Sequence, residues 1–231
     1  MKLDFDRLHA ADSGIKNHRP LPYAQDCLAR AVASHARWKA SNEVLRFSDL
    51  DTIEVGPVDH ALANQIKKYY CDQLLMKKLR GSELTRFQSD LWGLLSGRDT
   101  PEDRHVGMLY QVPFFYAEDL MRDALSREFN GVVKEFGMLH TRNRMVVTPH
   151  SKIFVTRRGS NRYEYWFVDQ EQRPAVLSVQ HTNPLRGLIN SLHQSGKPID
   201  FIANVKAVQD RHRPGFVFVT MINPEFAGVP N

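Results

Sequence analysis

Residues 151–168, SKIFVTRRGSNRYEYWFV, constrain the fold more than any other stretch of the chain. Two runs rich in β-branched and aromatic residues, 151–157 and 162–168, flank the polar turn 158–161. Gly159 and Asn161 tolerate positive φ in such a turn, and the flanking residue types suit a pleated surface. The pattern therefore predicts a β-hairpin, and the second half of the chain is organised around it.

The second strand of this hairpin, 162–168, alternates in character, so its two faces have different roles. The set that best suits a protein core is aromatic and consists of Tyr163, Tyr165 and Phe167. This choice places Trp166 outside beside Arg162, with Lys152 and Phe154 on the equivalent outer face of the first strand. Trp166 is then either an exposed platform for stacking bases or a side chain covered by the helical part of the chain.

From Met138 onward the sequence predicts five strands and one helix. The strands lie at 145–157, 162–168, 175–180, 199–208 and 216–222. The helix, 184–194, follows the third strand, and it starts with Asn183 as a capping residue and Pro184 in its first turn. Pro149 lacks a backbone N–H and is awkward in a central strand, so it predicts a bulge or an edge.

This order of elements resembles the OB-fold, a small five-stranded barrel with a helix between strands three and four. The resemblance is one of topology over residues 142–224, and no sequence motif carries it. It implies a binding face along strands two and three, framed by the first hairpin loop and the loop between strands four and five. Both loops, 157–162 and 209–215, are rich in arginine, which folding alone does not require.

The first part of the chain is predicted to be a bundle of about five helices. Apolar residues recur at three- and four-residue steps, and Pro, Gly and Ser residues mark the ends. The predicted helices lie at 22–39, 57–80, 83–95, 100–111 and 114–129. The fold class is thus α+β, with a helical domain over 1–138 and an OB-like β-barrel domain over 139–231. The join 131–140 is apolar, which predicts that the two parts pack together.

The basic excess lies entirely in the second part. Residues 139–231 hold 12 Lys+Arg against 6 Asp+Glu, whereas residues 1–138 have a net charge of −1. This asymmetry favours an acidic partner for the second part. Asp4 and Asp6 interrupt any signal core, and no apolar run is long enough to span a bilayer. Cys27 and Cys71 show no metal-ligand spacing, so we expect an intracellular (cytoplasmic) protein with reduced thiols.

No catalytic motif accompanies these features. The ten histidines show no metal-ligand spacing, and the chain has neither a glycine-rich phosphate loop nor a nucleophile elbow. We therefore expect no enzyme activity, no metal site and no cofactor. A phosphoesterase that uses some of these histidines is the weakest of the alternatives.

The sequence predicts a single-stranded DNA- or RNA-binding protein, accessory to replication, recombination or transcription. Arginine beside flat aromatic rings grips a phosphate backbone and stacks bases. The candidate contacts are Lys152, Phe154, Arg157, Arg158, Arg162, Trp166, Lys206, Arg211 and Arg213. In this hypothesis the helical part serves self-association or a protein partner. In the alternative, the protein is a structural adaptor whose barrel and helices bind other proteins, since fold alone does not define function.

Overall fold

The computed structural model describes residues 24–41, 52–97, 101–129, 141–157, 160–210, 213 and 215–228. Within them the chain has five α-helices and a closed, mixed β-barrel of five strands. The chain divides into two compact units, Met1–Tyr116 and Ala117–Asn231. The coarse α+β prediction is confirmed, while the predicted domain boundary between residues 138 and 139 stays a prediction. None of the helices in the described ranges has both the length and the apolarity that crossing a membrane requires.

The first unit is helical and has a core of its own. It contains α2 (Ala24–Ser41), α3 (Pro57–Leu79), α4 (Arg86–Leu95) and the first half of α5 (Asp103–Glu128). The most deeply buried side chains of this core come from all four helices and include Leu28, Ile66, Leu94, Leu109 and Val112. The helical periodicity that predicted these elements therefore corresponds to real buried faces.

The helix ends mostly follow the predicted capping signals. Pro57 opens α3, and Asp59 accepts a hydrogen bond from the backbone N–H of Gly56 at 2.8 Å. Gly81 follows α3 with φ +72°, a conformation that glycine adopts without strain. The helix predicted to start at residue 83, with Ser82 as its cap, starts later, because α4 begins after Thr85, whose side chain accepts from the backbone N–H of Gln88.

Two predicted helices, 100–111 and 114–129, are a single helix. Pro113 lies inside α5 and does not end it. Proline removes one backbone hydrogen bond and costs an isolated helix about 3 kcal/mol. Here Leu109, Val112 and Tyr116, which precede and follow the proline, are buried in one core. Packing on both sides of Pro113 therefore outweighs the local penalty.

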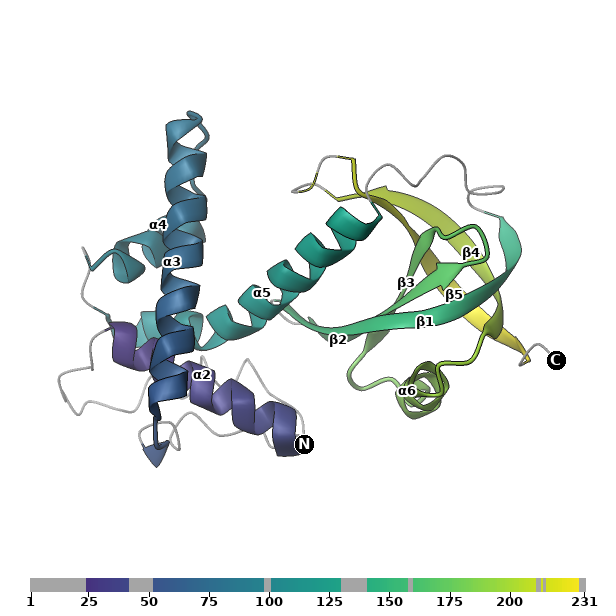
Figure 1. Ribbon diagram of the computed structural model, residues 1–231, viewed down its shortest axis with the longest axis horizontal. Coiled ribbons are helices and arrows are strands. Elements are labelled where there is room, and N and C mark those ends of the chain that lie inside the picture. The colour runs from purple at the N-terminus through teal and green to yellow at the C-terminus, as the bar shows by residue number, and fades with distance from the viewer. Residues whose placement is uncertain are drawn as a thin grey trace. The chain divides into compact units, whose positions relative to one another are not determined.

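The second unit contains the second half of α5 and the barrel. Its strands are β1 (Arg142–Arg157), β2 (Ser160–Asp169), β3 (Pro174–Gln180), β4 (Ile199–Gln209) and β5 (Val217–Gly228), with α6 (Arg186–Gln194) between β3 and β4 along the chain. The strand order is β1-β2-β3-β5-β4, and β1 closes the barrel by pairing with β4 (Figure 1). β3 and β5 run parallel, whereas the other pairs are antiparallel.

The long first strand pairs with two neighbours. Residues 142–147 pair with β4 and residues 147–157 with β2. The register with β2 shifts between Pro149 and Ser151, which leaves His150 as the extra residue of a bulge. The prediction that Pro149 marks a bulge is confirmed.

The barrel interior is filled as the alternation of β2 predicted. Tyr163, Tyr165 and Phe167 are all buried within the barrel core. Phe201 and Val219 reach the same core from β4 and β5, and Ile189 reaches it from α6. The predicted inward set is therefore confirmed, and the outward set, with Trp166, faces the other side of the sheet.

Candidate functional site

Trp166 is fully buried, with 0% of its surface exposed. Its ring stacks on Phe216 at 5.9 Å and meets Phe218 edge-on at 4.9 Å. Leu125 and Phe129, from the second half of α5 and the residue after it, belong to the same apolar cluster. The prediction that Trp166 is an exposed stacking platform is wrong, and the alternative, that helical residues cover it, is confirmed.

The second half of α5 thus covers one outer face of the barrel. We call this the α5-covered face, and its strand residues are Ile153, Val155, Trp166, Val176, Phe216 and Phe218. Leu125, four residues after Met121 and four before Phe129, belongs to an apolar stripe along the helix that meets these strands. The face that the sequence assigned to a nucleic acid is occupied by the chain itself.

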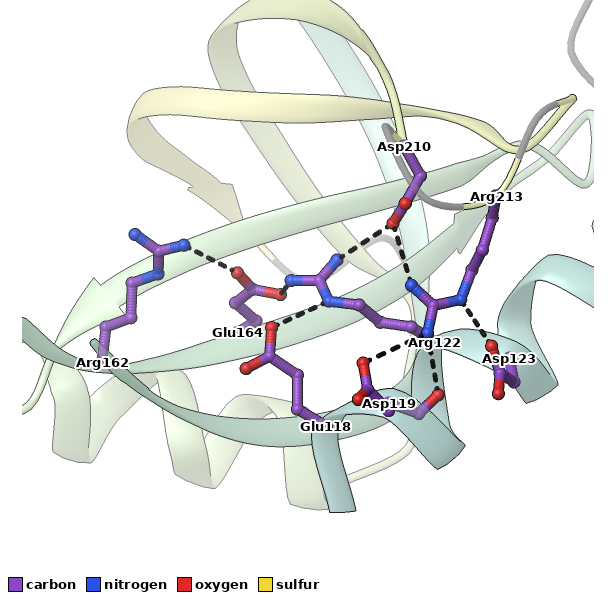
Figure 2. A network of polar contacts seen from close by, with 8 residues as sticks. All are labelled: Glu118, Asp119, Arg122, Asp123, Arg162, Glu164, Asp210 and Arg213. Atoms are coloured by element: carbon purple, nitrogen blue, oxygen red, sulfur yellow. Dashed lines mark hydrogen bonds and ion pairs between the residues drawn. The ribbon is translucent and has the colours of Figure 1, made fainter. Parts of the chain in front are cut away.

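Charged residues from α5, from β2 and from the segment after β4 form one connected network (Figure 2). Arg122, on α5, donates to Glu164 on β2 at 2.7 Å and to Glu118 at 3.0 Å, and lies 3.8 Å from Asp210. The side chains of Arg122 and Glu164 are 10% and 6% exposed. Arg162 bonds the second oxygen of Glu164 at 3.1 Å. A hydrogen-bonded ion pair thus joins the helix to β2, and a longer ion pair joins it to the residue after β4.

Arg213 is also committed to carboxylates. It donates to Asp123 at 2.7 Å and contacts Asp119 at 3.4 Å and Asp210 at 3.6 Å, with its side chain only 11% exposed. Burial alone would lower the pKa of Arg213, but the hydrogen bond to Asp123 and the three nearby carboxylates raise it above its usual value. The expectation of a solvated loop arginine, free to meet phosphates, is therefore wrong for Arg213.

Lys152 and Phe154 lie on the opposite side of the hairpin from Trp166, which corrects the predicted arrangement. In the register, Lys152 pairs with Tyr165 and Phe154 with Tyr163, so all four share one face. The extra residue of the bulge, His150, changes which strand residues face inward after it. The predicted outer set therefore splits between two surfaces.

A second, cationic surface forms where this hairpin face meets the start of α6. We call it the Lys152–Arg186 surface, and it consists of Lys152, Phe154, Tyr163, His181 and Arg186. Lys152 lies 4.4 Å from the ring centre of Tyr163, and the Arg186 guanidinium lies 5.7 Å from the same ring. Tyr163 also stacks on His181 at 5.9 Å and packs against Phe154 at 5.0 Å. Two cations thus share one aromatic ring.

Neutral polar groups hold the two cations of this surface. Within the described residues, neither Lys152 nor Arg186 forms an ion pair; Lys152 donates to the Asn190 side-chain oxygen at 2.7 Å and Arg186 to His181 at 3.0 Å. Burial and the charge of Arg186 lower the pKa of Lys152, and the same two causes lower the pKa of His181. Among the described residues, no carboxylate therefore compensates the positive charge of this surface.

The remaining predicted contacts are scattered or lie beyond description. Lys206 is exposed on β4, opposite Thr220 of β5. Arg157 ends β1, where only its backbone is described, and Arg158 and Arg211 lie outside the described residues. Of the nine predicted contacts, the structure brings Lys152 and Phe154 together on one face of the hairpin. A second group, Arg162, Trp166 and Arg213, lies at the α5-covered face.

Sequence reasoning missed Arg186, His181 and Asn190. Each lies on α6 or on the turn that precedes it, a segment treated only as a connection to the fourth strand. One local signal was available, namely a basic residue, Arg186, in the first turn of that helix.

No cluster of three or more His, Cys, Asp or Glu residues suited to a metal ion occurs among the residues that the structure describes. His150, at the bulge, lies between Ser151 at 3.1 Å and Glu128 at 3.2 Å. These contacts link the end of α5 to β1 at the protein surface.

Comparison with protein-family models, curated proteins and solved structures found no match to this chain.

Proposed function

We propose that the barrel is OB-like and that the protein binds single-stranded nucleic acid without catalysing a reaction, through the Lys152–Arg186 surface. The strand order β1-β2-β3-β5-β4, the closure of β1 on β4, the parallel β3–β5 pair and the position of α6 along the chain support the OB-like assignment. This proposal moves the interface away from the α5-covered face, where acidic side chains engage Arg162 and Arg213.

One observation carries the proposal: two cations lie against an aromatic ring, and neither pairs with a carboxylate in the part of the chain that the structure describes. Neighbouring like charges destabilise each other, and partial burial adds to that cost. A bound phosphate would relieve both effects. An aromatic ring beside such a cation also suits a nucleobase, because every base has a flat face that can stack on it. Phe154, which is half-buried, provides such a ring.

The proposal is tested by fluorescence anisotropy with labelled oligothymidylate over a range of salt concentrations. Each phosphate neutralised on a single strand contributes a slope of about −0.7 to the plot of log affinity against log salt. Lys152→Gln and Arg186→Gln should each weaken binding and flatten the slope by about that amount. Lys197→Gln, which removes an exposed charge after α6, is the matched control and should leave both unchanged. Equal binding by all four proteins would refute the assignment of this surface.

The adaptor hypothesis has an observation of its own. Leu185 and Leu188, at the start of α6, are 51% and 50% exposed. Apolar side chains beside a cationic surface suit an acidic, amphipathic protein segment. If the wild-type protein shows no salt-sensitive binding to single strands at micromolar concentration, the adaptor hypothesis takes the place of the nucleic-acid one.

A further inference from the structure

Tyr165 has a hydroxyl group that the fold buries without a partner. The residue is 0% exposed, and its hydroxyl has no hydrogen-bond partner among the described residues. Buried polar groups are nearly always paired, so an orphan of this kind needs an explanation. Tyr165 pairs with Lys152 across the hairpin, and the Lys152 ammonium lies 5.4 Å from its ring centre. The orphan hydroxyl therefore belongs to a residue that borders the Lys152–Arg186 surface.

The hydrogen bonds already present fix the orientation of two neighbours. A guanidinium has only donors, so the His181 Nδ1 that lies 3.0 Å from Arg186 must be an acceptor, and that ring is neutral. An ammonium also has only donors, so the Asn190 oxygen faces Lys152 and its NH₂ group remains a donor. His181 thus holds Arg186, and Asn190 extends the row of donors around Lys152.

The charge of this donor set suits one kind of phosphate best. Two cations match a terminal phosphate monoester, which carries a charge of about −1.5 to −2 near pH 7. An internal phosphodiester carries a single negative charge and would leave one cation uncompensated. A monoester also presents three terminal oxygens, enough to accept from Lys152, Arg186 and a third donor.

We propose that the Lys152–Arg186 surface, with the Tyr165 hydroxyl and the Asn190 amide, binds the terminal phosphate of a single strand in preference to an internal one. This inference rests on the proposed function, because it names the part of the strand that the surface recognises. Lys152 and Arg186 supply the charge, and Tyr165 gains in the complex the hydrogen bond that it lacks in the free protein.

The test compares oligothymidylates of about 15 nucleotides, near the upper end of the site size of one OB barrel. One pair carries a 5′-phosphate or a 5′-hydroxyl with the label at the 3′ end, and the other pair reverses the ends. One added charge-assisted hydrogen bond corresponds to about tenfold in affinity, so at least one phosphorylated end should bind about tenfold more tightly. Lys152→Gln and Arg186→Gln should abolish this preference, Tyr165→Phe should reduce it severalfold, and Lys197→Gln should retain it.

The outcomes separate the inference from the proposed function. If Lys152→Gln weakens strand binding while phosphorylated and unphosphorylated strands bind equally, the proposed function stands and the inference fails. Thermal shifts with thymidine monophosphate and thymidine provide a second measurement, because a ligand that binds only the folded state raises Tm. A rise with the monophosphate alone, lost in Lys152→Gln, supports recognition of the monoester by this surface. Absence of the preference at both ends overturns the inference.

Discussion

Arg122 is the residue on which the attachment of α5 to the barrel depends most directly. It is 8% exposed and contacts three carboxylates, of which Glu164 at 2.7 Å is the most deeply buried. Removing one partner of a buried ion pair leaves an uncompensated charge and costs about 3–5 kcal/mol. Glu164 would keep its hydrogen bond from Arg162, so for Arg122→Met we expect the lower end, about 3 kcal/mol.

A double-mutant cycle separates this charge effect from lost packing. Glu164→Gln removes the partner's charge but keeps a hydrogen-bond acceptor for Arg122, so we expect a loss of about 1–2 kcal/mol. In Arg122→Met combined with Glu164→Gln, no buried carboxylate remains at that position. The double variant should therefore be more stable than the sum of the single effects predicts, by about 1–2 kcal/mol.

The measurement is urea unfolding followed by tryptophan fluorescence. Replacing Trp38 and Trp92 with Phe leaves Trp166 alone to report on the second unit. Arg127→Met is the matched control, because Arg127 lies on the same helix, is exposed and donates only to the Asp123 carbonyl at 3.2 Å. It should change stability by no more than about 0.5 kcal/mol. If Arg122→Met behaves like this control, the network does not hold α5 to the barrel and the reasoning is refuted.

Three further predictions follow from the barrel. Tyr165→Phe should raise the free energy of unfolding by about 1 kcal/mol, because it removes an unpaired buried hydroxyl. Burial raises the pKa of Tyr165 to about 12 in the folded protein. Because the unfolded state loses this proton at a lower pH, near 10, the free energy of unfolding of the wild type should fall as pH rises from about 10 towards 12. Tyr165→Phe should not show this fall. Trp166→Ala should cost about 3–5 kcal/mol in urea unfolding, whereas an exposed tryptophan would cost little. A fragment of residues 139–231 should bind the apolar dye ANS more strongly than one of residues 117–231, because it lacks Leu125 and Phe129; equal dye binding would contradict the described cover.

The alternation of β2 and the order of elements could be predicted from sequence because they depend on neighbouring residues. Tyr163, Tyr165 and Phe167 recur with the two-residue period of a strand and fill the barrel as expected. The bulge at His150 was expected near Pro149, but its effect on the next residues was not. One extra residue changes which side chains share a face, and this moved Lys152 and Phe154 to the tyrosine face.

The partners of the arginines could not be predicted, because they come from distant parts of the chain. Arg213 meets Asp123 across 90 positions, and Arg122 meets Glu164 across 42. No local pattern marks such a pair. The prediction of a helix end at Pro113 was wrong for the opposite reason. Proline is a strong local signal for a helix end, but core packing before and after Pro113 outweighs that signal.

The position of the unit boundary changes what the net charge means. Residues 139–231 carry +6, but the second unit begins at Ala117 and carries +4 over residues 117–231. The acids that make this difference include Glu118, Asp119 and Asp123, all of which bind arginines around the α5-covered face. The positive charge that remains available to a ligand therefore lies at particular cations and is not spread over the whole unit. Cations without a carboxylate partner among the described residues are a better guide to a candidate interface than the net charge of a domain.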